Sequence, residues 1–198
     1  MNQRLDCSVV AVGASGGQGL RDMMALVKAL PPDLPAIVLL TLHRPADMPS
    51  HLAEILRRVS RLPVEIARDG EKLRPGACYV GEPARHLTLQ AGDRARLVDD
   101  EEIHRNTAID LLFESVATYA GPRAIGVVLS GALSDGSVGL EAIGAAGGLC
   151  MARAPDPGVV DDMPFNAIAL AGPLDCVESV GGLAREIERL VGPAVVDG

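Results

Sequence analysis

Aromatic residues and lysines are scarce in this sequence, and each shortage limits what the protein can be. Aromatic residues make up 2% of the 198 residues and tryptophan is absent, so the core must be built from Ala, Val, Leu and Ile. Only Lys28 and Lys72 are lysines, and the formal net charge is -8. Because contacts to phosphate groups require a basic surface, we expect no binding to nucleic acid.

Paired cysteines, a leader sequence and long apolar runs are also missing. The four cysteines lie far apart without a CxxC pair, so their spacing does not fit a metal site; they are Cys7, Cys78, Cys150 and Cys176. Each lies in an apolar run, which indicates buried free thiols. The N-terminus lacks the features of a signal peptide, and no apolar run approaches the length of a membrane span. We therefore expect a cytoplasmic protein that does not insert into a membrane.

Apolar runs rich in β-branched residues alternate with helical patterns along the chain. The runs that predict strands cover residues 7–13, 36–43, 63–67, 77–81, 124–131 and 147–152. The patterns that predict helices lie near residues 20–30, 51–59, 136–146 and 180–191. A further helix begins after Thr107, where Asp110 would complete a capping box. A proline-rich loop containing Pro155, Pro157 and Pro164 precedes the last helix.

This alternation predicts a doubly wound α/β fold with a mostly parallel sheet. Period-two patterns on either side of Ala91-Gly92-Asp93 predict an antiparallel hairpin near residues 86–99. Because the sequence contains no linker, repeat or low-complexity segment, residues 1–198 are interpreted as a single domain. Nothing in the sequence indicates an oligomeric state.

Three buried strands of this predicted sheet are each followed by a residue that suits ester hydrolysis. These residues are Ser15, His43 and Asp135. Sites in open α/β sheets form beyond the carboxyl ends of the strands, so we expect the three side chains to meet. A serine becomes a strong nucleophile when a histidine takes its proton, and an aspartate orients that histidine. The N–H group of Gly16, at the start of a helix, is a candidate donor to an oxyanion.

Each of these residues also has a simpler interpretation. Ser15 suits the N-cap of a helix, and so does Asp135 beside Gly136. His43 suits a structural hydrogen bond at the end of a strand. The three become a stronger signal together, because the predicted fold brings them to one edge. The remaining histidines are interpreted as structural or peripheral; they are His51, His86 and His104.

Several separated motifs add a family resemblance to this interpretation. They are GASGG at 13–17, LHRP at 42–45, RNTAIDLLF at 105–113, VVLSGALSDGSVGL at 127–140 and MPFNA at 163–167. In this order and spacing they resemble the catalytic domain of the chemotaxis methylesterase (CheB) family over about residues 7–191.

The resemblance implies a serine hydrolase that removes methyl groups from glutamate methyl esters on a chemoreceptor-type protein. It implies Ser15, His43 and Asp135 as the catalytic residues, acting without a metal or an organic cofactor. Gly16 and Ala132 would donate backbone N–H groups to the oxyanion, and Arg105 would bind the substrate. Family members often also deamidate selected glutamines.

Two departures from the family pattern bear on regulation and activity. The family usually carries an N-terminal receiver domain, whereas this sequence opens with the catalytic domain. We therefore expect constitutive activity or control by a partner. Gly16 stands where the family commonly has a threonine, which leaves open a non-catalytic module that binds receptors or signalling partners.

A dinucleotide-dependent oxidoreductase is the other alternative. Gly13, Gly17 and Gly19 follow a strand in a pattern that suits a pyrophosphate. Such enzymes also need a Tyr-x-x-x-Lys pair, which neither Tyr79 nor Tyr119 provides.

Overall fold

Seven strands form one parallel sheet in the computed structural model, which describes residues 8–43, 51–81, 85–99, 107–132, 134–157 and 162–192. The strands are β1 (Ser8–Ser15), β2 (Ala36–His43), β3 (Val64–Ile66), β4 (Ala77–Val80), β7 (Ala124–Val128), β8 (Leu149–Arg153) and β9 (Cys176–Glu178). Their order across the sheet is β3-β4-β2-β1-β7-β8-β9. The chain changes direction across the sheet at β1, and such switch points are where ligand crevices form in open α/β sheets.

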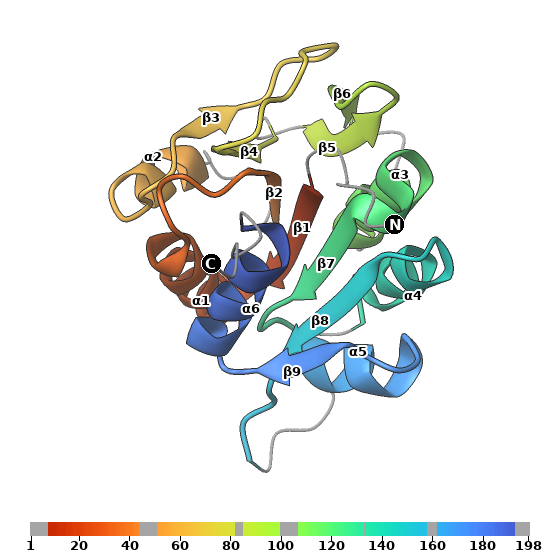
Figure 1. Ribbon diagram of the computed structural model, residues 1–198. Coiled ribbons are helices and arrows are strands. Elements are labelled where there is room, and N and C mark those ends of the chain that lie inside the picture. Colours follow the sequence, from red (N-terminus) through yellow and green to blue (C-terminus); the bar gives the residue numbers. More distant parts are fainter. Residues whose placement is uncertain are drawn as a thin grey trace, which may run out of the picture.

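Helices cover both faces of this sheet (Figure 1). One face carries α1 (Gly16–Ala29), α2 (Leu52–Arg57) and α6 (Val180–Val191), and the other carries α3 (Ala108–Ala120), α4 (Ser137–Ala145) and α5 (Met163–Leu170). Val10 and Val12 of β1 pack in the cluster that includes α1, whereas Val9 and Ala11 pack in the cluster that includes α3. Because both faces of β1 are buried, its sequence is a continuous apolar run.

An antiparallel hairpin of β5 (Arg85–Gln90) and β6 (Arg94–Asp99) packs against α3. The backbone N–H of Leu89 in the hairpin donates to Ser115 Oγ of α3 at 2.9 Å. A 3-10 turn, η2 (Gly121–Arg123), then leads from α3 into β7. The doubly wound sheet and the hairpin predicted near residues 86–99 are both confirmed.

The predicted proline-rich loop is wrong in its last part, because α5 begins at Met163. Pro164 lies in the first turn of this helix, where a missing N–H group removes no helical hydrogen bond. The three-residue strand β9 has no distinctive sequence pattern and is not predicted either. A three-residue edge strand, and a helix with proline in its first turn, are both difficult to recognise from sequence.

Among the described cysteines, Cys78 and Cys150 are buried free thiols, as predicted, whereas Cys176 is only half-buried. Cys7 lies outside the described residues. No described helix is long and apolar enough to cross a membrane. Within the described ranges, no three His, Cys, Asp or Glu side chains gather in a way that would hold a metal ion.

Candidate active site at the carboxyl ends of β1, β2 and β7

Ser15 and His43 are direct neighbours in the parallel ladder. They are the last residues of β1 and β2, and their Cα atoms are partners in the register of the two strands. Side chains alternate along a strand, so Ser15 lies on the same face as Ala11, and His43 on the same face as Leu39. Ala11 and Leu39 both belong to the cluster that includes α3. The serine and the histidine therefore share one face at one edge of the sheet.

Neither side chain is committed to a structural hydrogen bond within the described residues. Ser15 occupies the N-cap position of α1, but its hydroxyl accepts no hydrogen bond from that helix. The imidazole of His43 likewise has no hydrogen-bond partner in the described part of the chain. Both residues are half-buried. Among the described residues, neither simpler interpretation is therefore supported: Ser15 makes no side-chain cap bond and His43 makes no structural hydrogen bond.

The segment after β7 lies against Ser15. Ser15 N–H donates to the carbonyl oxygen of Ser130 at 3.0 Å, which extends the contact between β1 and β7. A Cβ atom added to Gly131 would lie 2.7 Å from Ser15 Cβ and would overlap Met163 Sδ. The backbone at position 131 therefore approaches Ser15 so closely that only glycine fits without displacing a neighbour.

Two exposed backbone segments near Ser15 carry the N–H groups predicted to bind an oxyanion. Gly16 is the first residue of α1, where N–H groups have no acceptor inside the helix. Ala132 forms an isolated antiparallel bridge with Asp162. The hydrogen bond beside this bridge runs from Met163 N–H to the carbonyl oxygen of Gly131 at 3.0 Å. No described residue accepts a hydrogen bond from Ala132 N–H.

Asp135 binds the N-terminus of α3 instead of standing free. Its carboxylate accepts hydrogen bonds from the N–H groups of Ile109 at 3.1 Å and Asp110 at 2.9 Å. The predicted capping box at Thr107 is wrong, because the Thr107 side chain makes no cap bond to α3. The helix-capping interpretation of Asp135 is realised, but the helix that it caps is α3 and not the helix that follows it.

Burial governs the charge of Asp135. The residue is 8% exposed, and loss of solvation raises its pKa from 3.8 to about 6. The N–H groups of Asp110 and Ile109 act in the opposite direction, whereas the charge of Asp110 raises the pKa further. Burial also raises the pKa of Asp110, whereas the backbone N–H groups that donate hydrogen bonds to its carboxylate lower this pKa. Burial therefore raises the pKa of both carboxyl groups.

The structure brings Ser15 and His43 together but joins neither of them to Asp135 by a hydrogen bond among the described residues. Each oxygen of Asp135 accepts one N–H group and keeps a second lone pair. Hydrogen bonds of catalytic residues often tighten only when substrate binds. Arg105, predicted to bind substrate, lies outside the described residues.

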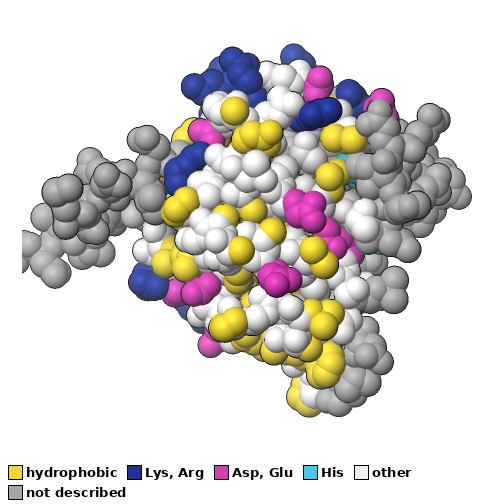
Figure 2. All heavy atoms as spheres, turned by 90° about the vertical axis from the view of Figure 1, so that its right-hand side faces the viewer, with side chains coloured by type: hydrophobic (Ala, Val, Ile, Leu, Met, Phe, Trp, Pro, Cys, Tyr) yellow, Lys and Arg dark blue, Asp and Glu magenta, His cyan; other side chains and the backbone are white. Residues whose placement is uncertain are grey.

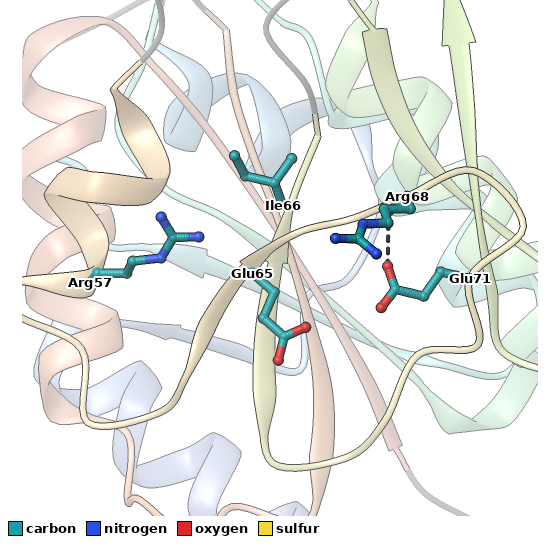
Figure 3. Close-up of a pocket in the computed structure, with 5 residues that line it drawn as sticks. All are labelled: Arg57, Glu65, Ile66, Arg68 and Glu71. Carbon is teal, nitrogen blue, oxygen red and sulfur yellow. Dashed lines mark hydrogen bonds between the residues drawn. The ribbon is translucent and has the colours of Figure 1, made fainter.

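A groove of about 450 Å³ lies elsewhere, beside the outermost strand β3. Figure 3 shows its lining; these residues are Arg57, Glu65, Ile66, Arg68 and Glu71. None of the described residues that line the groove is a serine, histidine or cysteine, and β3 stands three positions from β1 in the sheet. It therefore has no nucleophile of its own, and the chemistry expected at Ser15 does not extend to it.

Asp110 and Gly131 are two residues whose part in the site sequence reasoning does not identify. Asp110 is predicted only as part of a capping box of its own helix, and Gly131 only as the last residue of the strand predicted over residues 124–131. The one available signal is the density of glycines around Asp135, since Gly131 and Gly136 flank it closely. Glycines of this kind indicate close backbone approach.

Comparisons with known proteins identify a family and its fold. The family model described as CheB methylesterase matches residues 10–187. A protein-glutamate methylesterase/protein-glutamine glutaminase from Yersinia pestis is 38% identical over 174 residues, which cover 86% of this chain and 49% of that protein. A protein from Geobacter sulfurreducens, of the same name with the number 3, is 36% identical over 191 residues, covering 93% of this chain and 50% of that protein.

The similarity extends to a solved structure. The crystal structure of the Thermotoga maritima CheB methylesterase catalytic domain matches with a TM-score of 0.83 and 28% identity, covering 93% of this chain and 99% of that chain. By contrast, the chain spans about half the length of the curated relatives it matches. None of the proteins named here is a dinucleotide-dependent oxidoreductase.

Proposed function

The chain belongs to the CheB methylesterase family, and we propose that it hydrolyses glutamate γ-methyl esters on a chemoreceptor-type protein. The names of the Yersinia and Geobacter relatives support this substrate class. Glutamine deamidation is a second reaction of the same site in this proposal, because an ester and a primary amide differ at the acyl carbon only in the leaving group. Free thiols such as that of Cys78 are typical of proteins in the reducing cytoplasm, which is the compartment that we propose.

Ser15 is the nucleophile, His43 the general base and Asp135 the residue that orients His43. Ser15 Oγ attacks the ester carbonyl carbon while His43 takes the hydroxyl proton, and a tetrahedral intermediate forms. The bond to the methoxy oxygen then breaks, and His43 returns the proton so that methanol leaves. Water, deprotonated by His43, next attacks the acyl-enzyme and releases the glutamate side chain and the Ser15 hydroxyl.

The N–H groups of Gly16 and Ala132 stabilise the oxyanion of both tetrahedral intermediates. Support for Gly16 comes from its place at the first position of α1, where the helix dipole adds partial positive charge. Support for Ala132 comes from its exposed backbone next to Gly131, which approaches Ser15. Fixed donors of this kind need no reorganisation when charge develops, which makes them effective in catalysis.

A protein substrate is favoured by exposed apolar side chains on α4 and α5. Figure 2 shows the face formed by α3, α4 and α5, where apolar side chains gather at the lower end. Phe165, two residues after Met163, is 40% exposed, and Val138, in the first turn of α4, is 58% exposed. Exposed apolar side chains that lie together are typical of contacts with another protein.

The observation that carries this proposal is the pairing of Ser15 with His43 in the ladder between β1 and β2. Neighbouring strands lie roughly 4.8 Å apart, so two side chains on the same face at paired positions lie within reach of each other. The pairing depends on backbone hydrogen bonds alone. It therefore exists before any substrate binds.

Replacement of the nucleophile tests the proposal. Ser15→Ala should lower methanol release from membranes carrying a methylated chemoreceptor by about four to six orders of magnitude, because members of such a triad act as a unit. The folded state should be unaffected, since the Ser15 hydroxyl has no partner among the described residues. Far-ultraviolet circular dichroism checks the fold.

Ser115→Ala is the matched control. It also removes a serine hydroxyl, but one that accepts the Leu89 N–H in the hairpin and stands on α3. Methanol release by this variant should equal that of the wild type once the fraction of folded protein is taken into account. Unchanged release by Ser15→Ala would refute the assignment of the nucleophile.

A further inference from the structure

Asp110 and Asp135 cap each other's helices. Asp135 accepts hydrogen bonds from the N–H groups of Ile109 and Asp110 in the first turn of α3. In return, Asp110 Oδ1 accepts hydrogen bonds from the N–H groups of Gly136 at 2.9 Å and Gly139 at 2.7 Å, at the start of α4. Each carboxylate thus holds the N-terminus of the helix that belongs to the other. We call this arrangement the reciprocal cap.

Ile109 connects the reciprocal cap to the end of β1. Its side chain is fully buried. A Cβ atom added to Gly13 would overlap Ile109 Cγ2, and one added to Gly136 would lie 2.8 Å from the same atom. The first turn of α3 therefore touches both the strand that ends at Ser15 and the turn that carries Asp135. A shift of this turn would move both.

Two carboxylates this close repel each other, so the reciprocal cap forms only where enough donors surround it. Four backbone N–H groups, two for each carboxylate, supply these donors. All four belong to the first turns of α3 and α4 or to the residue directly before α4, where helix dipoles favour negative charge. The position of Asp135 is consequently determined by Asp110 together with both helices, and not by its own short turn alone.

We infer that Asp110 is a positioning residue: by holding Gly136, the neighbour of Asp135, it fixes the direction from which the Asp135 carboxylate meets His43. This inference rests on the proposed hydrolysis by Ser15, His43 and Asp135. Asp110 touches no reacting atom. It acts through the turn at Gly136, where φ is +97°, a conformation that glycine adopts readily and other residues rarely adopt.

Three variants of the purified chain test the inference. Asp110→Ala removes both bonds to α4, and Asp110→Asn keeps a carbonyl oxygen able to accept them. Asp175→Ala is the matched control, because the Asp175 carboxylate also accepts a hydrogen bond from a backbone N–H group, that of Cys150 at 2.8 Å. Cys150 lies near the amino end of β8, whereas Ser15 and His43 lie at the carboxyl ends of their strands. Two rates are measured: methanol release from methylated receptor membranes, and the reaction of Ser15 with a fluorophosphonate, which bonds to the serine oxygen and loses fluoride.

Asp110→Ala should lower kcat and the fluorophosphonate rate by about 10- to 100-fold, because misplacement of a catalytic group by about 1 Å has effects of this size. KM should change less than kcat, since the residue does not contact substrate. Asp110→Asn should restore both rates to within about threefold of the wild type, because one oxygen accepts both bonds. Asp175→Ala should keep both rates.

The inference is wrong if Asp110→Ala reacts as fast as the wild type, if Asp110→Asn is as slow as Asp110→Ala, or if Asp175→Ala loses as much activity as Asp110→Ala. Should Asp110→Ala fail to fold, Asp110→Ser takes its place under the same criteria. The serine hydroxyl lies one bond closer to the backbone than the aspartate oxygens, so it should not reach the N–H groups of Gly136 and Gly139. Failure of the proposed function has a different signature: the wild type then lacks fluorophosphonate labelling at Ser15.

Discussion

Ser15 and His43 form the strand-end half of the proposed site, and Asp110 and Asp135 form its helix-junction half. The strand-end half is positioned by backbone hydrogen bonds between β1 and β2, which do not depend on its side chains. The helix-junction half is positioned by side-chain carboxylates bound to backbone N–H groups. A substitution of Ser15 or His43 should therefore lower catalytic activity and leave the backbone of the site in place. A substitution of Asp110 or Asp135 should change both the activity and the position of the backbone.

The largest effect separating the halves is expected at His43. His43→Gln should lower methanol release by about four orders of magnitude or more, because it removes the general base. The midpoint of urea unfolding should stay near that of the wild type, since His43 is half-buried and has no hydrogen-bond partner among the described residues. Activity and stability are measured on the same preparation.

The double variant of Ser15→Ala and His43→Gln sharpens this result. If the two residues act as a unit, the double variant should be no slower than Ser15→Ala alone. Losses that multiply would show that the residues act independently, which would contradict the shared role of the strand-end half.

A smaller effect is expected at Gly131, which lies between the halves. Gly131→Ala should lower the unfolding free energy by about 1–3 kcal/mol, the usual cost of overpacking. The added Cβ would lie 2.7 Å from Ser15 Cβ, so methanol release should fall as well. Met163 has a flexible side chain and can move aside, which makes the contact with Ser15 the decisive one. Urea unfolding and methanol release measure the two effects.

Gly181→Ala is the matched glycine control. Gly181 lies in α6, where an added Cβ would come no closer than 3.6 Å to its nearest neighbour, a side-chain nitrogen of Arg185. Alanine there should raise the unfolding free energy by about 0.5–1 kcal/mol, because it restricts the unfolded chain in a helical position. Equal destabilisation by both substitutions would show that Gly131 has no special packing role.

A dependence of stability on pH is expected in the helix-junction half. Burial raises the pKa of Asp135 from 3.8, the value of an unperturbed carboxyl group, to about 6 in the folded protein, so the ionised group opposes folding. Its favourable contribution is present below about pH 4 and is lost as the pH rises through about 6. The unfolding free energy of the wild type minus that of Asp135→Asn should fall over this interval in urea titrations. A difference that rises with pH would contradict the raised pKa.

The sequence predicts most of the sheet because buried parallel strands are continuous apolar runs. The run at 36–43 coincides with β2, and the hairpin pattern falls within a residue of β5 and β6. The helix α5 is obscured by Pro164, whose position in a first turn is recognisable only when the start of the helix is known. The family match over residues 10–187 agrees with the motif resemblance over about residues 7–191.

The candidate site divides in the same way. Ser15 and His43 can be placed from the sequence, because parallel strands end at the same edge of a sheet. The partners of Asp135 cannot, because they lie 25 and 26 residues away on another helix. A capping box is the local alternative for Asp110, and the tertiary contact with α4 replaces it. The chemical roles of all the predicted site residues stay predictions; these residues are Ser15, His43, Asp135, Gly16, Ala132 and Arg105.

The amino-acid sequence alone specifies where the buried strands lie and that they alternate with helices, although β1 extends two residues beyond its predicted end and β7 stops three residues short of it. These features depend on local periodicity and on the preferences of single residues, which neighbouring residues encode. Only the tertiary structure decided that Asp110 and Asp135 hold each other's helices and that Gly131 lies against Ser15. Such contacts depend on how closely distant segments pack and on which buried N–H groups need an acceptor, and both are settled only when the whole chain is folded.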